Sequence, residues 1–338
     1  MREFCRFLKK ILVLFSPVFL LIVFYVVSDP FKVIRSYQQY YRSGGPNYVF
    51  LNKDYVSTET FIRNYPRYKY DSFIFGNSRS IFYLVEDWRL HINSDRCFHF
   101  DASGESLYGI VRKFEFLRKR GVIIKNALII MDAQLLSETT NSSGHLFIKH
   151  PALSGQSRWA FQRYFFQAFI SKGFFVSYAA LKFSPRNKPH IDPDVMETRP
   201  IDYDSMKNEI TFSYYENMIA RNPDEYYRPR INQFKKRDPL PAVSPPMIGN
   251  NQRELLMEIS EILRRDEADY RLVISPLYDQ INLNPSDELY LCELFGRDKV
   301  FNFSGINEIT KDYTNYYDYS HYRPHVTRTI MKIIYEKR

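Results

Sequence analysis

The sequence predicts a three-layer α/β/α domain built on a five-stranded parallel sheet. The first observation is a set of short apolar runs that end in small or polar residues, which is typical of parallel strands buried on both faces. The second is that helix-like stretches lie between these runs, and such alternation is typical of an α/β domain with a parallel sheet. The expected strands are 71–76, 96–101, 126–132, 270–276 and 299–304.

The expected helices have apolar residues on one face and recognisable ends. The stretch 106–121 carries such a stripe and stops at a glycine, a residue type that commonly ends helices. The stretch 251–265 repeats the pattern, and 285–296 begins with a capping-type serine, Ser286. A last helix is expected over the apolar positions between 326 and 334.

A long interval, residues 135–250, separates the third and fourth strands and is predicted to be a cap-like insertion, because a crossover needs far fewer residues. Inside it, 164–183 is strongly apolar but contains Lys172. A membrane span there would hold this lysine near its centre, at about 3 kcal/mol. We therefore expect an amphipathic cap over the active face, or a helix lying on the membrane, rather than a second span.

Composition argues for a packed, mildly basic protein. Hydrophobic residues make up 45% of the 338 residues and aromatic residues 17%, which excludes a disordered chain. The 27 Tyr and 28 Phe fit either a large core or a cleft that stacks on sugar rings. The net charge of +9 is spread along the chain without a nucleic-acid-binding motif, so we expect no nucleic acid partner. A basic surface that faces anionic envelope polymers or lipid headgroups also explains the charge.

The N-terminus predicts a membrane anchor. An uncharged apolar run, 11–28, follows a basic tail, 1–10, and reaches roughly 27 Å as a helix, close to the thickness of a bilayer core. The run ends in VVSDPF, whose bulky residues do not suit signal-peptide cleavage. The basic residues of the tail should remain in the cytoplasm; they are Arg2, Arg6, Lys9 and Lys10.

This pattern predicts a single-pass protein of the inner (cytoplasmic) membrane. A juxtamembrane tether, 29–68, would join the anchor to an extracytoplasmic or periplasmic domain, 69–338. Cys97 and Cys292 would lie outside the cytoplasm, where they could form one disulfide or remain two buried thiols. No Cys/His spacing resembles a metal site, so we expect neither a metal nor a cofactor.

A serine, a glycine-bearing loop and an Asp/His pair follow three of the predicted strands, and together they suggest catalysis by an activated serine. Ligands of open parallel sheets bind at the carboxyl ends of the strands. Ser78 follows the first strand, Gly104 lies in the loop after the second, and Asp318 and His321 come just before the last helix. A serine hydroxyl needs an imidazole to take its proton, and the imidazole needs a carboxylate to orient it. Backbone amides at a strand end can stabilise the oxyanion.

Each of these residues also has a structural alternative. Ser78 could cap the following helix, and the Asp318–His321 pair could simply tie down the last helix. Arg79, next to the serine, could hold an anionic substrate or be solvated.

With these residues in place, the chain resembles the SGNH/GDSL hydrolase superfamily, in FIFGNSRS, in FDASGES and in NYYDYSHYRPHV. The resemblance covers roughly residues 69–338 without the insertion, and implies a flavodoxin-like sheet with Ser78 as nucleophile, His321 as general base and Asp318 as its partner. It also implies that the amides of Ser78 and Gly104 form the oxyanion hole.

The chain departs from the family pattern at two points. Asn77 stands where the family has the Asp of its GDS turn, and Asn77 and Arg79 are candidates for oxyanion or substrate binding. No G-x-N-D block follows the third strand. The third oxyanion donor is therefore unassigned among Asp132, Gln134 and Asn141.

The layout is similar to that of membrane-anchored proteins of polysaccharide O-acetylation and teichoic-acid D-alanylation. The resemblance implies a serine esterase or O-acyltransferase acting on acyl groups, expected to be acetyl, of a cell-envelope polysaccharide, with a membrane-bound O-acyltransferase as a partner. The alternative is a non-catalytic glycan-binding or scaffold protein of the same system. A phosphodiesterase is a more distant alternative, because no metal ligands or phosphate loop are visible.

Overall fold

A five-stranded parallel sheet forms the centre of the protein. The computed structural model describes residues 2–183, 196–234, 237 and 240–336. Near the start of the first helix it describes the backbone but not eight of the side chains, among them those of Arg2, Cys5, Arg6 and Lys9. The strand order is β3-β2-β4-β8-β10, and each neighbouring pair is parallel. The strands are β2 (Ser72–Gly76), β3 (Cys97–Asp101), β4 (Asn126–Met131), β8 (Asp269–Ile274) and β10 (Val300–Asn302). The five predicted strands are thus confirmed.

Side chains alternate between two cores, one on each face of the sheet, as the pleat of a strand requires. In β2, Phe73 and Phe75 enter one core and Ile74 the other. In β4, Ile129 and Ile130 divide in the same way. Because both faces are buried, the strands read as continuous apolar runs in the sequence.

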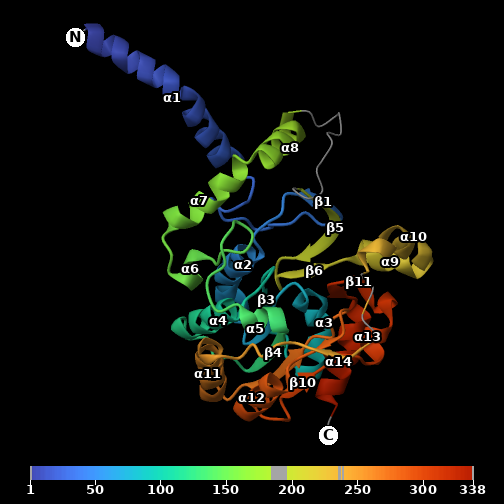
Figure 1. Cartoon of the computed structure of the whole chain (residues 1–338). Helices are drawn as coiled ribbons and strands as arrows, with labels where there is room; N and C mark the ends of the chain where they lie inside the picture. The colour runs from blue at the N-terminus through green and yellow to red at the C-terminus, as the bar shows by residue number, and fades with distance from the viewer. Residues whose placement is uncertain (1, 184–195, 235–236, 238–239, 337–338) are drawn as a thin grey trace.

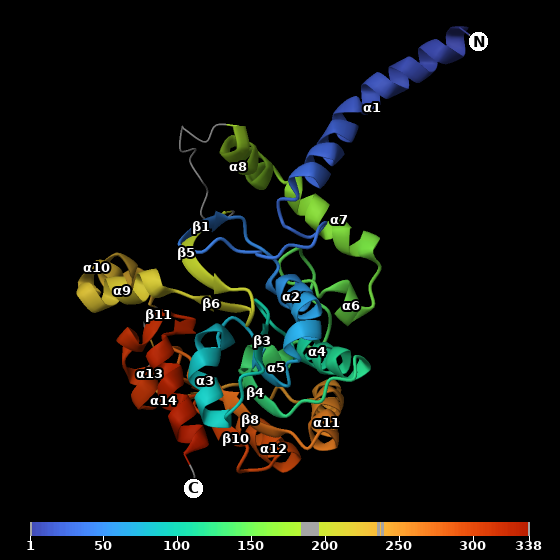
Figure 2. The ribbon, with the colours of Figure 1, turned by 180° about the vertical axis from the view of Figure 1, so that it is seen from behind.

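Helices cover both faces of the sheet (Figures 1 and 2). One face is covered by α2 (Lys53–Tyr68), α4 (Leu107–Lys119), α11 (Asn250–Arg265) and α12 (Pro285–Phe295). The other face is covered by α3 (Val85–Ile92) and α14 (Pro324–Tyr335). The predicted helices at 106–121, 251–265, 285–296 and 326–334 are all present. The cap of α12 was predicted wrongly: Asn284, and not Ser286, is the N-cap, and its side chain accepts the N–H of Ser286.

In chain order the sheet reads 2-1-3-4-5, so the direction of winding reverses between β2 and β4. Doubly wound sheets bind their ligands at the carboxyl ends of the strands beside such a reversal. The residues after β2 and β4 therefore lie where a ligand site is expected.

The expected tether, 29–68, was wrong for its second half. It contains β1 (Gly45–Tyr48) and α2, and Phe61 of α2 is fully buried against the sheet. The first turn of α2 begins with two charged residues of the predicted tether, Lys53 and Asp54. Both are buried, because Lys53 pairs with Asp101 at 3.4 Å and Asp54 with a lysine of α4 at 3.3 Å.

The insertion is more ordered than its proline-rich sequence suggests. It contributes β5 (Glu197–Asp204) and β6 (Glu209–Thr211), which form an antiparallel sheet with β1. Its helical elements are α5 (Ala133–Ser137), α6 (Pro151–Ser154), α7 (Arg158–Phe169), α8 (Lys172–Phe183), α9 (Ser213–Arg221), α10 (Pro223–Tyr227) and the 3₁₀ helix η2 (Arg228–Gln233). Residues 184–195, another part of the insertion, lie outside the described residues.

The apolar stretch 164–183 belongs to α7 and α8 and does not cover the carboxyl ends of the sheet. Phe165, Phe169 and Phe174 instead form a third apolar cluster with Tyr25 and Phe31, at the end of the first helix. Figure 1 shows α7 and α8 beside that helix.

The first helix, α1 (Arg2–Ser28), projects from the body of the protein (Figures 1 and 2). Among the residues whose side chains are described, no helix combines the length and the apolar character that crossing a membrane requires. The span predicted over 11–28 is therefore not supported by this part of the structure.

Cys97 and Cys292 are free thiols that pack in the cores on opposite faces of the sheet. The sheet therefore lies between them, which excludes the alternative of a disulfide.

Short elements complete the fold. The short elements are η1 (Ser80–Phe82), β7 (Ala242–Val243), β9 (Ile281–Asn282), α13 (Glu308–Lys311), η3 (Tyr313–Asn315), β11 (Tyr316–Asp318) and β12 (His321–Tyr322).

Candidate active site

Ser78 lies on a tight turn between β2 and η1. The turn starts at Gly76, whose φ is +156°, a conformation that side-chain-bearing residues rarely adopt. A Cβ added there would lie 2.8 Å from Ser80 Cβ and 3.0 Å from Ile130 Cβ. The next residues close the turn, because the N–H and the hydroxyl of Ser80 both donate to the carbonyl of Asn77. The glycine thus lets the chain turn sharply against β4.

Asp318 and His321 face each other across the hairpin formed by β11 and β12. The hairpin is closed by Asp318 itself, whose Oδ1 accepts the N–H groups of Ser320 at 2.8 Å and His321 at 3.0 Å. The D-x-x-H spacing therefore places the two side chains together through a hairpin, a local arrangement that the sequence alone encodes.

The structure brings Ser78, His321 and Asp318 into one hydrogen-bonded row. Ser78 Oγ lies 3.0 Å from His321 Nε2, and His321 Nδ1 lies 3.0 Å from each carboxylate oxygen of Asp318. In this row the imidazole can accept the serine proton at Nε2 while its Nδ1–H donates to the carboxylate. Ser78 does not cap a helix: η1 has Arg79 as its N-cap and lacks a side-chain capping bond.

The carboxylate of Asp318 is held in its ionised form. Burial acts to raise its pKa, but the hydrogen bond from His321, the charge of His321 and the two backbone N–H donors outweigh burial and lower the pKa. Asp318 is 30% exposed and His321 25%, so the pair borders solvent rather than the core. An ionised Asp318 can stabilise the imidazolium that forms when His321 takes a proton.

Asn77 and Arg79, both predicted to bind oxyanion or substrate, lie instead in a network centred on Asp132. Asp132 Oδ2 accepts from Asn77 Nδ2 at 2.6 Å and from Arg79 Nη1 at 2.7 Å. Arg79 also donates from Nε and Nη2 to the carbonyl and the hydroxyl of Ser320. Arg79 thereby ties the Ser78 turn to the hairpin that carries His321.

The remaining candidates for a third oxyanion donor also have other roles. Asp132 caps α5 by accepting the N–H of Leu135, and its other oxygen accepts from Asn77 and Arg79, so it acts as an acceptor rather than a donor. Asn141 accepts the N–H of Lys149 through its Oδ1, and Gln134 lines a separate cavity. Within the described residues, no side chain from this group of three lines the cavity that contains Ser78.

Gly104 lies opposite on the loop after β3, where the sequence predicts it. Its φ is +54°, and a Cβ there would lie 2.9 Å from the ring of Phe147. The backbone N–H groups of Gly104 and Ser78 donate to no backbone acceptor within the described residues. An oxyanion is stabilised by N–H donors that have no other acceptor, and these two amides belong to residues that line the cavity.

Four of the candidate residues line a cavity of about 570 Å³, whereas Asn77 and Arg79 do not. Besides Ser78, His321, Asp318 and Gly104, its wall is largely aromatic, with Phe82, Phe147, Phe212, Tyr215, Tyr226 and Tyr317. Comparison of the sequence with protein-family models and with curated proteins found no match. The cavity itself is therefore the basis for a functional assignment.

Sequence reasoning missed two arginines of this cavity, both from the insertion. Arg230 lies over the ring of Tyr226, with its guanidinium carbon 4.2 Å from the ring centroid, and over Tyr215 at 5.7 Å. Arg199 is held by Glu197 through its Nε and Nη2. Nothing in their sequence context marks them, because the insertion brings them to the cavity through tertiary folding.

Among the described residues, no group of three His, Cys, Asp or Glu could hold a metal ion.

Proposed function

We propose that the protein is a serine esterase or O-acyltransferase of the SGNH/GDSL type, acting on acyl groups of a cell-envelope polysaccharide. The observation that carries the proposal is the row of Ser78, His321 and Asp318 at the wall of the 570 Å³ cavity. The order of the sheet, 2-1-3-4-5, and the place of the serine after its first strand also support the resemblance.

In the proposed reaction, Ser78 Oγ attacks the ester carbonyl carbon while its proton passes to His321 Nε2. The carbonyl oxygen becomes an oxyanion, which the N–H groups of Ser78 and Gly104 stabilise. The imidazolium then gives its proton to the departing oxygen, and an acyl-serine remains. Water or a sugar hydroxyl attacks this ester in turn, and the same imidazole first takes and then returns the proton.

The cavity wall suits a sugar ring better than a long acyl chain. Aromatic rings pack on the apolar faces of sugars, while tyrosine hydroxyls and arginines donate to sugar oxygens. Arg230 adds positive charge at this wall, whereas the charge of Arg199 is paired with that of Glu197. The acyl group would be small, expected to be acetyl, and the glycan is expected to be an envelope polysaccharide.

We also propose that α1 anchors the protein in the inner membrane with its N-terminus in the cytoplasm. The support is its projection from the body and its many exposed apolar side chains. These are Phe4, Phe7, Val13, Leu14, Phe15, Val18, Phe19, Leu20, Ile22, Val23, Val26 and Val27. A membrane-bound O-acyltransferase would then be a suitable supplier of acyl groups.

The test is turnover of p-nitrophenyl acetate by the full chain in detergent. Ser78→Ala and His321→Ala should each remove most of the rate enhancement, on the order of 10⁴-fold or more. Ser137→Ala, an exposed serine bonded within its own turn, is the matched control and should retain full activity. A fluorophosphonate should label wild-type Ser78 and leave Ser78→Ala unlabelled. Turnover that persists in Ser78→Ala would contradict the proposal, and glycan binding without any turnover would indicate the scaffold alternative.

A further inference from the structure

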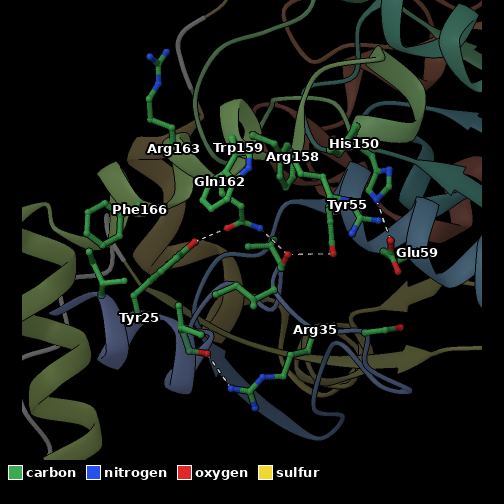
Figure 3. Close-up of a pocket in the computed structure, with 17 residues that line it drawn as sticks. Tyr25, Arg35, Tyr55, Glu59, His150, Arg158, Trp159, Gln162, Arg163 and Phe166 are labelled. Carbon is green, nitrogen blue, oxygen red and sulfur yellow. Dashed lines mark hydrogen bonds and ion pairs between the residues drawn. The ribbon is translucent and has the colours of Figure 1, made fainter. Parts of the chain in front are cut away.

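A second cavity, of about 630 Å³, lies where α1 joins the body of the protein (Figure 3). It is distinct from the Ser78 cavity, because the two cavities share no lining residue. Its walls come from the end of α1, the segment after it, α2, and the stretch from 150 to 166. Nothing in the proposed ester chemistry uses this cavity.

One wall of the cavity is apolar and continuous with the exposed surface of α1. Ile22 and Val26 line it from α1, and each is 43% exposed. Phe166 and Trp159 line it from α7, and Trp159 is 88% exposed. A large aromatic residue so exposed is unusual on a surface that faces water alone, whereas tryptophan is enriched where proteins meet the membrane interface.

The rim of the cavity is positively charged. Arg35, Arg158 and Arg163 line it, and within the described residues none of them forms an ion pair within 4.0 Å of a carboxylate. Arg35 donates from Nη2 to the carbonyls of Val26 and Val27 and so remains at the end of α1. Figure 3 shows Arg163 pointing away from the other labelled residues, so Arg35 and Arg158 are the cations of the cavity.

The one carboxylate of the lining, Glu59, is already paired. Its Oε1 lies 3.0 Å from His150 Nε2, and this hydrogen bond, together with the charges of His150 and Arg158, lowers its pKa. Gln162 is also engaged, since it accepts from Tyr25 and donates to the carbonyl of Val33. Glu59 offsets part of the charge of Arg158, but three arginines line the cavity against this one carboxylate, so the rim keeps a net positive charge.

We propose that this cavity binds an anionic phospholipid of the membrane, with the phosphate at Arg35 and Arg158 and an acyl chain along Ile22 and Val26. The inference rests on the proposed membrane location of α1, and is independent of the proposed ester chemistry. Ile22 precedes Ser28, the last residue of α1, by six residues, or about 9 Å of helix. With Ser28 at the membrane surface, Ile22 would therefore reach the boundary between headgroups and acyl chains. A soluble anion would leave the apolar wall uncovered.

The test uses the fluorescence of Trp159 in the full chain, reconstituted in nanodiscs. The chain has two tryptophans, and Trp88 is fully buried, so Trp159 is the one that bilayer lipids can reach. Brominated phosphatidylglycerol should quench it more strongly than brominated phosphatidylcholine at equal mole fraction. Trp159→Phe should remove the quenching, which shows that the signal comes from this site.

The arginine variants decide whether the preference is a property of the cavity. Arg35→Gln and Arg158→Gln should each reduce the preference for the anionic lipid about fivefold, as expected for one basic residue at an anionic surface. Arg163→Gln is the matched control on the same rim and should keep most of the preference. Equal quenching by the two lipids, or a preference that survives Arg35→Gln with Arg158→Gln, would overturn the proposal.

Two outcomes separate this inference from its premises. A chain that does not float with vesicles of either lipid would refute the membrane location of α1, and the lipid site with it. A chain that floats but shows no lipid preference refutes the lipid site alone. Turnover of p-nitrophenyl acetate should be unchanged in Arg35→Gln, because that residue lies outside the Ser78 cavity.

Discussion

Ser78 Oγ and His321 Nε2 lie 3.0 Å apart although 243 positions separate them in the chain. Two local structures make this contact: the turn after β2, which depends on Gly76, and the hairpin that Asp318 closes. Arg79 joins the two by bonding Ser320 of the hairpin. Hydrogen bonds therefore fix both the turn that carries Ser78 and the hairpin that carries His321. Such fixed positions are needed for a reaction that depends on accurate alignment of its groups.

Asp318→Asn should leave the hairpin in place and reduce turnover. The asparagine Oδ1 can still accept the N–H groups of Ser320 and His321, while the negative charge that stabilises the imidazolium is lost. We expect kcat for p-nitrophenyl acetate to fall by roughly 10²- to 10⁴-fold, and by no more than in His321→Ala. Circular dichroism should show an unchanged fold. Wild-type turnover in Asp318→Asn would show that the carboxylate has only a structural role.

Asp132 should act as a positioning residue for the serine turn. In Asp132→Ala, Asn77 and Arg79 lose their shared acceptor, so the turn that carries Ser78 loses two of its side-chain bonds. We expect kcat to fall at least tenfold with little change in KM for a small ester, because the cavity wall is unaltered. Asp132→Asn, which keeps one acceptor oxygen, should recover part of kcat. A change in KM alone would contradict this role.

The strands could be predicted from sequence because burial on both faces leaves a continuous apolar run, as in Phe73, Ile74 and Phe75. The convergence of Ser78 with His321 could be expected because both lie at the carboxyl edge of the sheet. Their separation of 3.0 Å could not, since it depends on bonds made by Arg79 and Asp132.

The errors share a physical cause: each concerns a residue whose place is set by contacts with residues distant in sequence. Lys53 pairs with Asp101, which lies 48 positions later, so α2 was mistaken for a tether. Arg79 was expected to hold an anionic substrate or to be solvated, but it pairs with Asp132, which lies 53 positions later. Arg199 and Arg230 were missed because the path of the insertion is set by packing rather than by local pattern.

Glu105 should contribute strongly to the stability of the protein. Its carboxylate is fully buried and pairs with Lys113 and with Lys149, the latter at 2.6 Å. Glu105→Gln would leave two buried ammonium groups short of one negative charge, and we expect a loss of about 3–5 kcal/mol in the free energy of unfolding. Urea denaturation measures it. Glu308→Gln, in an exposed pair with Lys311, is the control and should change stability by less than about 1 kcal/mol.

Glu209, on β6, should make the stability of the protein depend on pH. The side chain is buried and accepts the N–H of Val85, which begins α3. Burial raises its pKa to about 7, because the bond from Val85 and the charge of Lys207 offset only part of the desolvation. The folded state therefore binds this proton more tightly than the unfolded chain does.

The sign of the effect follows from this difference in proton binding. The stabilisation from Glu209 is fully present below pH about 4.5 and is lost as the pH rises through about 7, with a total of roughly 3 kcal/mol. Urea unfolding of wild type and Glu209→Gln between these pH values should give curves that diverge, with the variant gaining relative stability as the pH rises. His99, whose pKa burial lowers to about 4, acts in the opposite direction but equally in both proteins, so the difference curve isolates Glu209. Parallel curves would show that Glu209 is ionised in the folded protein across this range, and that Val85 and Lys207 are sufficient to stabilise its charge.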